Sequence, residues 1–154
     1  MSDNFSVFLV DDDPGVLKAL KRLLGAKGYE TKSFTSPKEF LASHDPAQPG
    51  CAVIDLAMPG LDGLEVQKAL AKQASDRPVI FLSGRANVSC TVRAMQAGAV
   101  DFLEKPVSSA DLLSAISRAA ERDSRLRRVH DEEKSSSHHT WAHGRTPGRK
   151  VELS

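Results

Sequence analysis

The sequence predicts an α/β fold in which a parallel β-sheet is covered by helices on both faces. Five short apolar runs alternate with longer stretches in which apolar residues recur at helical spacing. The run at residues 78–82 is apolar throughout, as is typical of a strand that helices bury on both sides. This strict alternation of strand and helix indicates a parallel sheet, with each helix serving as the crossover to the next strand.

The first two strand–helix units are predicted from residues 5–43. A strand over residues 5–10 stops at three aspartates, after which Asp13 suits a helix cap and Pro14 the first helical turn. The helix carries an apolar stripe and ends at Gly28: Val16, Leu17, Leu20, Leu23 and Leu24. A weaker strand over residues 29–34 and a short helix opened by Ser36-Pro37 follow, and the prolines and glycine of residues 44–50 predict a loop.

The remaining units follow the same alternation. A strand at residues 51–55 ends in Asp55 and runs directly into a Met-Pro-Gly loop. The further elements are predicted, in chain order, as a helix at 64–73, a strand at 78–82, a helix from 88 closed by Gly98, a strand at 100–104 and a helix from 109 to about 125.

Residues 1–122 are therefore predicted to form one domain, and residues 123–154 a helix extension with a largely disordered tail. Residues 121–134 are dense in charge and could continue the last helix. Residues 135–154 hold too few apolar side chains to offset the entropy of ordering, so we expect disorder there. Three histidines and several arginines lie beyond residue 120, and we interpret them as solvated rather than as a metal or nucleic-acid site: His138, His139, His143, Arg122, Arg125, Arg127 and Arg128.

Composition narrows the classes of function. The net charge is +1, which gives no general attraction to nucleic acid or membrane surfaces. No apolar run approaches the roughly 20 residues of a membrane span, and the first residues lack the pattern of a signal peptide. Cys51 and Cys90 have no metal-binding spacing, as is common for a reducing compartment. A cytoplasmic protein is expected.

Polar residues stand at or just beyond the ends of four predicted strands, where an open parallel sheet collects its ligands. They are Asp11 and Asp12, Asp55, Ser83, and Lys105. Three converging carboxylates repel one another and need a cation, and oxygen ligands suit Mg²⁺. An ion, an ammonium and a hydroxyl around one carboxylate can stabilise a phosphoryl group in transfer, so Asp55 is predicted to attack phosphorus as a nucleophile.

These residues occur in four motifs that resemble the receiver domain of two-component response regulators, the CheY-like family, and most closely its FixJ subgroup. The motifs are Val10 to Asp13, Asp55 to Gly60 with Gly63, Ser83-Gly84, and Ala94 to Pro106. The resemblance covers roughly residues 5–120. It implies a flavodoxin-like fold with five strands in the order 2-1-3-4-5, an order known for CheY itself.

The resemblance also implies roles for individual residues. Asp55 would be the phosphoacceptor, Asp12 would bind Mg²⁺ directly and Asp11 through water, and the backbone carbonyl of Ala57 would be a further ligand. Lys105 would contact the phosphoryl oxygens. Ser83 and Phe102 would form a switch pair that remodels the surface of the fourth helix, fifth strand and fifth helix, and the bond before Pro106 would be cis.

The function predicted on this basis is a receiver that accepts a phosphoryl group from the phosphohistidine of a sensor histidine kinase or phosphotransfer protein. Its remodelled surface would bind a partner or form a homodimer. It would catalyse its own aspartyl phosphorylation and dephosphorylation without being a conventional enzyme. The alternative is a FixJ-type transcriptional regulator that lacks its DNA-binding domain in this chain. Direct DNA binding is not expected, and the absence of a glycine-rich phosphate loop argues against a nucleotide-binding enzyme.

Simpler interpretations remain open for several of these residues. Phe102 could serve packing alone, and Ser83 could bond only its own loop backbone. Asp11 could be a solvated loop acid and Lys105 a surface lysine. Asp13 is interpreted as the helix cap rather than as a member of the metal site.

Overall fold

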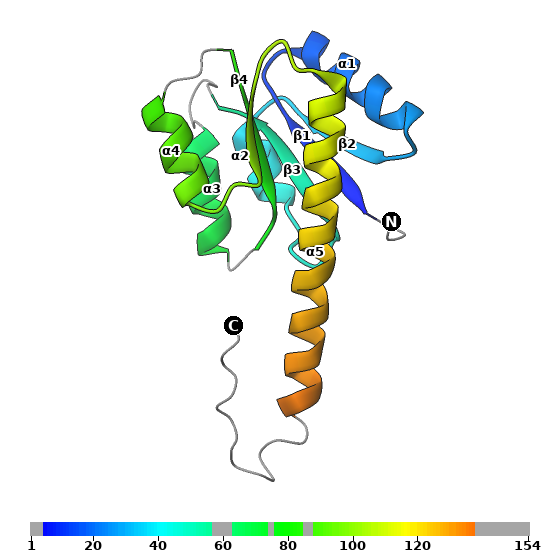
Figure 1. Ribbon diagram of the computed structural model, residues 1–154, viewed down its shortest axis with the longest axis vertical. Coiled ribbons are helices and arrows are strands. Elements are labelled where there is room, and N and C mark those ends of the chain that lie inside the picture. The colour runs from blue at the N-terminus through cyan, green and yellow to red at the C-terminus, as the bar shows by residue number, and fades with distance from the viewer. Residues whose placement is uncertain (1–4, 57–62, 74–75, 85–87, 138–154) are drawn as a thin grey trace. The chain divides into compact units, whose positions relative to one another are not determined.

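The structure, a computed structural model, describes residues 5–56, 63–73, 76–84 and 88–137, with side chains as far as residue 129. Strands and helices alternate along the described part of the chain (Figure 1). The strands are β1 (Ser6–Val10), β2 (Glu30–Phe34), β3 (Gly50–Asp55), β4 (Val79–Ser83) and β5 (Asp101–Glu104). The helices are α1 (Pro14–Ala26), α2 (Pro37–Ser43), α3 (Gly63–Lys72), α4 (Val88–Gln96) and α5 (Ser109–Ser137).

The five strands form one parallel sheet in the order β2-β1-β3-β4-β5, which confirms the predicted fold class and strand order. The register aligns the last residues of the central strands. Val10 pairs with Ile54, Asp55 with Leu82, and Ser83 with Glu104. Because all strands run the same way, their carboxyl ends meet at a single edge of the sheet.

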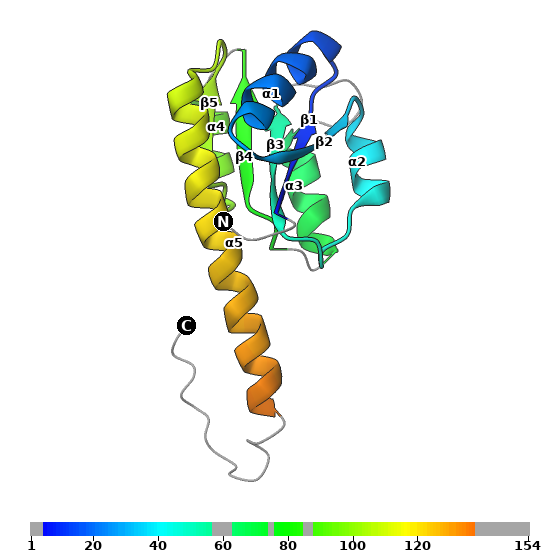
Figure 2. The same ribbon diagram turned by 90° about the vertical axis from the view of Figure 1, so that its right-hand side faces the viewer.

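Helices cover both faces of the sheet, as Figures 1 and 2 show from two directions. The leucines of α1 and the apolar side of α5 pack on one face with Val7, Leu9 and Val53. Side chains of α2, α3 and α4 pack on the other face with Phe8, Ile54 and Phe81. The strands β1, β3 and β4 are buried along their whole length, which explains why their sequences are apolar rather than alternating.

Several predicted helix boundaries are confirmed by their capping contacts. The Asp13 carboxylate accepts a hydrogen bond from the Gly15 N–H at 2.9 Å, and α1 begins at Pro14 as expected. Ser36 caps α2 by accepting a hydrogen bond from the Glu39 N–H at 3.4 Å. Gly28 lies just beyond α1 with φ of 88°, a conformation in which glycine carries no side-chain penalty.

The helix α5 is longer than the sequence suggests. It runs to Ser137, past the end expected at about residue 125 and through residues 121–134, which could continue it, and the expectation of disorder is wrong for residues 135–137. Residues 125–134 include arginines, a leucine, two glutamates and a lysine, all good helix formers, which agrees with the extension. The rest of the predicted tail, residues 138–154, lies outside the described residues. The chain divides into compact units at 1–123 and 124–154.

Within the described ranges, no helix is both long and apolar enough to cross a membrane.

Candidate functional site

Three carboxylates converge at the carboxyl edge of the sheet. Asp11 and Asp12 follow β1, and Asp55 is the last residue of β3. Each offers an oxygen atom that lies within 4.8 Å of an oxygen from the other two. Asp11 and Asp55 are 2% and 7% exposed, whereas Asp12 is exposed. The strand ends thus bring together the three acids that the sequence predicts at one site.

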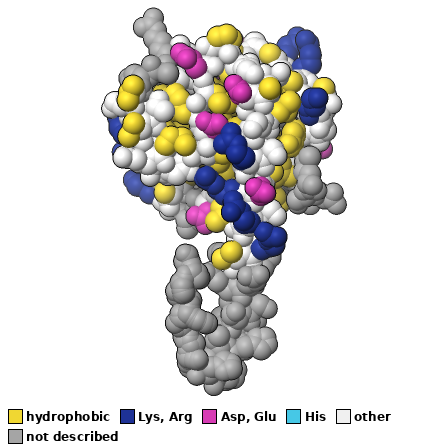
Figure 3. Space-filling model, viewed as in Figure 1, with side chains coloured by type: hydrophobic (Ala, Val, Ile, Leu, Met, Phe, Trp, Pro, Cys, Tyr) yellow, Lys and Arg dark blue, Asp and Glu magenta, His cyan; other side chains and the backbone are white. Residues whose placement is uncertain are grey.

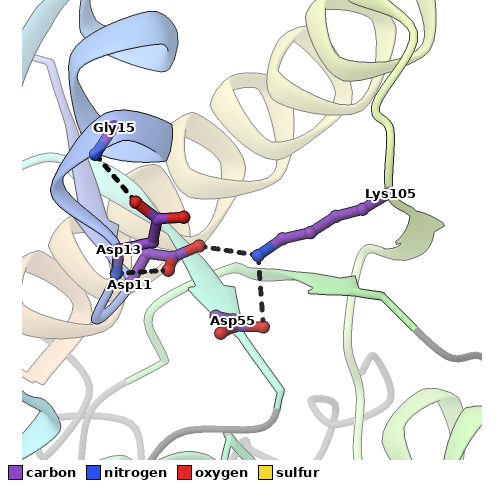
Figure 4. A network of polar contacts seen from close by, with 5 residues as sticks. All are labelled: Asp11, Asp13, Gly15, Asp55 and Lys105. Carbon is purple, nitrogen blue, oxygen red and sulfur yellow. Dashed lines mark hydrogen bonds and ion pairs between the residues drawn. The ribbon is translucent and has the colours of Figure 1, made fainter.

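Lys105 supplies the cation that this cluster faces (Figure 4). Its side chain extends from the turn after β5, and Nζ lies 2.9 Å from Oδ2 of Asp11 and 3.6 Å from Oδ1 of Asp55. Burial alone would lower the pKa of Lys105, but the hydrogen bond with Asp11 and the charges of Asp11 and Asp55 raise it above the usual lysine value. The side chain of Lys105 is therefore protonated at neutral pH.

The backbone around Asp11 fixes the direction of its carboxylate. Oδ1 accepts a hydrogen bond from the Asp13 N–H at 2.9 Å, which leaves Oδ2 directed at Lys105. The Asp11 N–H in turn donates to the Phe34 carbonyl of β2 at 3.1 Å. Asp13 points away from this cluster because its own carboxylate caps α1 (Figure 4). The acid next to the site thus orients one of its members rather than joining it.

Ser83 ends β4 at the same edge and is 3% exposed. Its carbonyl oxygen accepts a hydrogen bond from the Lys105 N–H at 2.7 Å. The backbone position of Lys105 is therefore tied to the end of β4, while its side chain reaches the acids at the ends of β1 and β3. The peptide bond between Lys105 and Pro106 is cis, as the family resemblance led us to expect.

Phe102 is partly buried on β5. Its ring centroid lies 6.3 Å from that of Phe81, with the two ring planes tilted by 50°. The Phe102 N–H donates to Oδ1 of Asp101 at 2.8 Å. Phe102 thus has a packing contact in the core cluster beneath α4, and its backbone is held by a neighbouring carboxylate. Both the packing and the switch interpretations agree with this position.

One predicted ligand, the carbonyl of Ala57, lies outside the described residues. Conversely, the structure shows two arginine contacts that sequence reasoning missed. Arg118 of α5 pairs with Asp101 at 2.7 Å, and Arg122 donates to the Gly98 carbonyl at 2.6 Å. They tie α5 to the segment that leads into β5. The pair of Arg118 and Asp101 joins residues 17 positions apart, and nothing in the local sequence of Asp101 indicates such a partner.

The donor set defines which ligand would fit. Among the described residues of this site, three carboxylates face one ammonium, so these four groups carry a formal charge of −2 before any ligand binds. Oxygen donors with one exposed member suit a hard divalent cation that retains part of its water shell. The arrangement is thus suited to Mg²⁺ and, through the cation and Lys105, to the oxygens of a phosphoryl group.

Comparison with known proteins places these motifs in a family. The family model described as "Response regulator receiver domain" matches residues 7–117. Nodulation protein W of Bradyrhizobium diazoefficiens is 42% identical over 121 residues, which are 79% of this chain and 53% of that protein. Transcriptional regulatory protein FixJ of Azorhizobium caulinodans is 36% identical over 131 residues, 85% of this chain and 62% of that protein.

A solved structure of the response regulator StyR superimposes on 88% of this chain and 68% of its own, with a TM-score of 0.84 and 35% identity. The chain spans 53% and 62% of the two curated relatives named above. The shared part is the one that carries the five-stranded sheet and the acidic edge. The strand order, the acids at the ends of β1 and β3, the lysine after β5 and the matching family model agree, and this chain belongs to the response regulator receiver domain family.

Proposed function

We propose that this receiver domain accepts a phosphoryl group on Asp55 from the phosphohistidine of a sensor histidine kinase or a phosphotransfer protein. The observation that carries the proposal is a 7% exposed carboxylate at a strand end, 3.6 Å from the Lys105 ammonium and beside two further acids. Burying a charged carboxylate costs free energy, so its burial at this position indicates a functional role. Membership of the receiver family makes two-component signalling the context.

The transfer requires one bond to form and one to break. An oxygen of Asp55 attacks phosphorus, the new O–P bond gives an acyl phosphate, and the P–N bond to the donor imidazole breaks with its electron pair returning to nitrogen. Lys105 neutralises charge on the transferring oxygens. Asp11 holds that ammonium at the site through its 2.9 Å contact. Water can later cleave the acyl phosphate, so the domain would catalyse its own turnover without acting as a conventional enzyme.

Mg²⁺ is the proposed cofactor. Asp11, Asp12 and Asp55 would hold it, together with the carbonyl of Ala57, and the ion would draw negative charge from the phosphoryl oxygens. The excess of carboxylates over ammonium groups at the edge supports this proposal, because it leaves room for two further positive charges.

We further propose that Ser83 and Phe102 pass the chemical event to the surface of α4, β5 and α5, where a partner or a second copy binds. Support comes from the apolar surface over α4, which Figure 3 shows at its left edge. Val88, Val92 and Met95 are 80%, 45% and 43% exposed there. Exposed apolar side chains grouped on one helix are typical of an interaction surface.

Phosphorylation can be tested directly. The protein is incubated with Mg²⁺ and a small-molecule phosphodonor, and its intact mass is measured. The wild type should gain one phosphoryl group, and Asp55→Asn should gain none. Asp13→Asn is the matched control, because asparagine also caps helices and Asp13 points away from the site. An adduct of equal amount in Asp55→Asn would exclude Asp55 as the acceptor.

Metal binding needs a separate measurement. Mg²⁺ is titrated into the protein while the amide chemical shifts are recorded. In the wild type, the amide resonances of residues around β1 and β3 should shift as the ion binds. Asp12→Asn should weaken the affinity at least about tenfold, because one charged ligand is lost. An unchanged affinity in Asp12→Asn would remove Asp12 from the ligand set, while leaving the phosphorylation result to stand by itself.

A further inference from the structure

A buried cation lies at the opposite edge of the sheet, where the strands begin. Arg77 precedes β4 and is 7% exposed. Its guanidinium donates to three backbone carbonyls, two in the segment between α2 and β3 and one in the first residue of β3: Asp45 at 2.9 Å, Gln48 at 2.7 Å and Gly50 at 2.9 Å. It also lies 4.9 Å from the centroid of the Phe8 ring. Residues 45–50 are thus wrapped around one side chain.

Another Arg77 contact determines the protonation state of a histidine. The Arg77 Nε–H donates to Nε2 of His44 at 3.1 Å, and arginine remains protonated at every pH at which proteins fold. Nε2 must therefore carry a lone pair. Nδ1 of His44 lies 3.2 Å from Oε1 of Gln73, an acceptor, so the ring proton belongs on Nδ1. The network assigns His44 as neutral, in one defined tautomer.

The groups around the His44 ring disfavour its protonated form. Arg77 faces it from the segment before β4, Lys32 of β2 shares the adjoining cavity, and α3 contributes the neutral Gln73. The one acid among them, Asp45, already accepts the Ala47 N–H at 2.9 Å. Phe8 and Phe40 flank the ring at centroid distances of 6.5 and 5.5 Å. The cavity, of about 290 Å³, gives the ring space to leave.

We infer that His44 and Arg77 form an acid-sensitive clamp on residues 44–50: protonation of His44 breaks the clamp and opens this segment. Uptake of a proton at Nε2 removes the acceptor of the Arg77 N–H and places two cations in contact. The ring then turns into the cavity, and the carbonyls of Asp45, Gln48 and Gly50 lose a partner that was held in place. This device lies at the edge of the sheet away from Asp55 and operates without phosphorylation.

The sign of the pH dependence follows from the neutral form. Burial lowers the pKa of His44 below its ordinary value of 6.5, the charge of Arg77 lowers it further, and the Gln73 contact and Asp45 oppose this only in part. The clamp is therefore complete above pH 6.5 and weakens as the pH falls. The open fraction should rise as the pH falls below 6.5, with a slope that stays under about tenfold per pH unit, until the closed form itself takes up the proton.

Amide hydrogen exchange measures this opening at single residues. The reporters are the Gln48 N–H, bound to the Asp45 carbonyl at 3.0 Å, and the Ser6 N–H, bound to the Pro49 carbonyl at 3.0 Å. After correction for intrinsic exchange, their rates should rise as the pH falls from 6.5 to 5.5, by about fivefold at most. The Asp11 N–H, at the other end of the sheet, should show no such rise.

The matched variant is His44→Gln, because glutamine offers an uncharged acceptor near the position of Nε2 and cannot be protonated. The variant shares every other ionisable group with the wild type. The difference in the pH dependence of exchange between the two proteins therefore reports the protonation of His44 alone. Exchange at Gln48 and Ser6 should be nearly independent of pH in this variant. An equal acid acceleration in His44→Gln would overturn the inference.

The ring of His44 provides a second measurement that does not depend on the variant folding. Its Cε1–H resonance, identified through the ring contacts with Phe8 and Phe40, should titrate below 6.5 in the wild type. Its midpoint should fall at the pH at which the acid acceleration of exchange in residues 44–50 levels off, because there the closed form takes up the proton. Titration at or above 6.5, or exchange that does not follow it, would refute the clamp.

Discussion

The two edges of the sheet each hold a cation inside the molecule, and they neutralise it in different ways. Lys105, at the carboxyl edge, faces carboxylates and is 24% exposed in its side chain. Arg77, at the amino edge, is held by backbone carbonyls and a neutral imidazole and is 7% exposed. Carboxylates carry charge that can attract a metal cation and can react with phosphorus, whereas neutral backbone carbonyls are not nucleophiles toward phosphorus. The first edge is therefore suited to chemistry and the second to holding the fold.

Among the variants that test this difference between the two edges, the largest expected effect is a loss of stability when the buried arginine is replaced. Arg77→Ala should lower the free energy of unfolding by about 3–5 kcal/mol, because three backbone carbonyls, of which that of Gly50 is buried, and an imidazole lose their donor. Urea denaturation measures the change. Lys105→Ala is the matched control and should change stability by about 1 kcal/mol or less, because its ammonium is partly hydrated. Equal losses in the two variants would contradict the division of roles between the edges.

Cys51 offers a reporter inside the sheet. It is fully buried in β3, and burial raises the pKa of its thiol to about 12 from 9.0. The thiolate fraction at neutral pH is then roughly a thousandfold lower than for a free thiol, so a thiol reagent should modify half-buried Cys90 first. In a Cys90→Ser background, Arg77→Lys should speed the labelling of Cys51. Rapid labelling of Cys51 in the Cys90→Ser protein that keeps Arg77 would show that the amino edge of the sheet opens freely.

At the carboxyl edge the expected effect is kinetic. Lys105→Ala should slow phosphorylation of Asp55 by a small-molecule donor about a hundredfold, as expected when one charge-stabilising donor is lost. The initial rate of mass gain in the presence of Mg²⁺ measures this. Arg118→Ala removes a cation of α5 that contacts Asp101 rather than the acids, and its initial rate should match the wild type. A rate loss confined to Arg118→Ala would place the critical cation elsewhere.

The smallest effect is expected at Ser83. Ser83→Thr keeps the hydroxyl and adds one methyl group at a position that is 3% exposed, so the free energy of unfolding should change by less than about 1.5 kcal/mol. The bond from the Lys105 N–H to the Ser83 carbonyl should persist, since it involves only backbone atoms. Thermal denaturation and phosphorylation rates measured together would detect a larger disturbance.

The carboxyl edge could be predicted from the sequence because its residues mark strand ends. Asp55 follows an apolar run in which an acid has no packing role, and Lys105 precedes a proline that ends the run at residues 100–104. The amino edge could not, because Arg77 stands alone before Pro78 and three of the four groups described above as its acceptors are backbone carbonyls, which every residue carries. His44 likewise stands in a stretch that reads only as a loop. Contacts between a side chain and a distant backbone leave no pattern in a single sequence.

The ends of the helices likewise differ in how well the sequence predicts them. Gly28 and Asp13 act locally, so the limits of α1 followed from neighbouring residues. The end of α5 depends on a balance of weak helix propensities over many residues, and it fell about twelve positions beyond the expected one.

The parallel register has a consequence for how such a domain can diversify. Asp55 stands opposite Leu82 and Ser83 opposite Glu104, and side chains alternate between the two faces of every strand. Inserting or deleting one residue within β3 or β4 would turn the acid or the hydroxyl to the wrong side and push apolar residues out of the core. Lineages of this fold can therefore replace residues at the reactive edge one by one, while changes of length are confined to the connections between strands and helices.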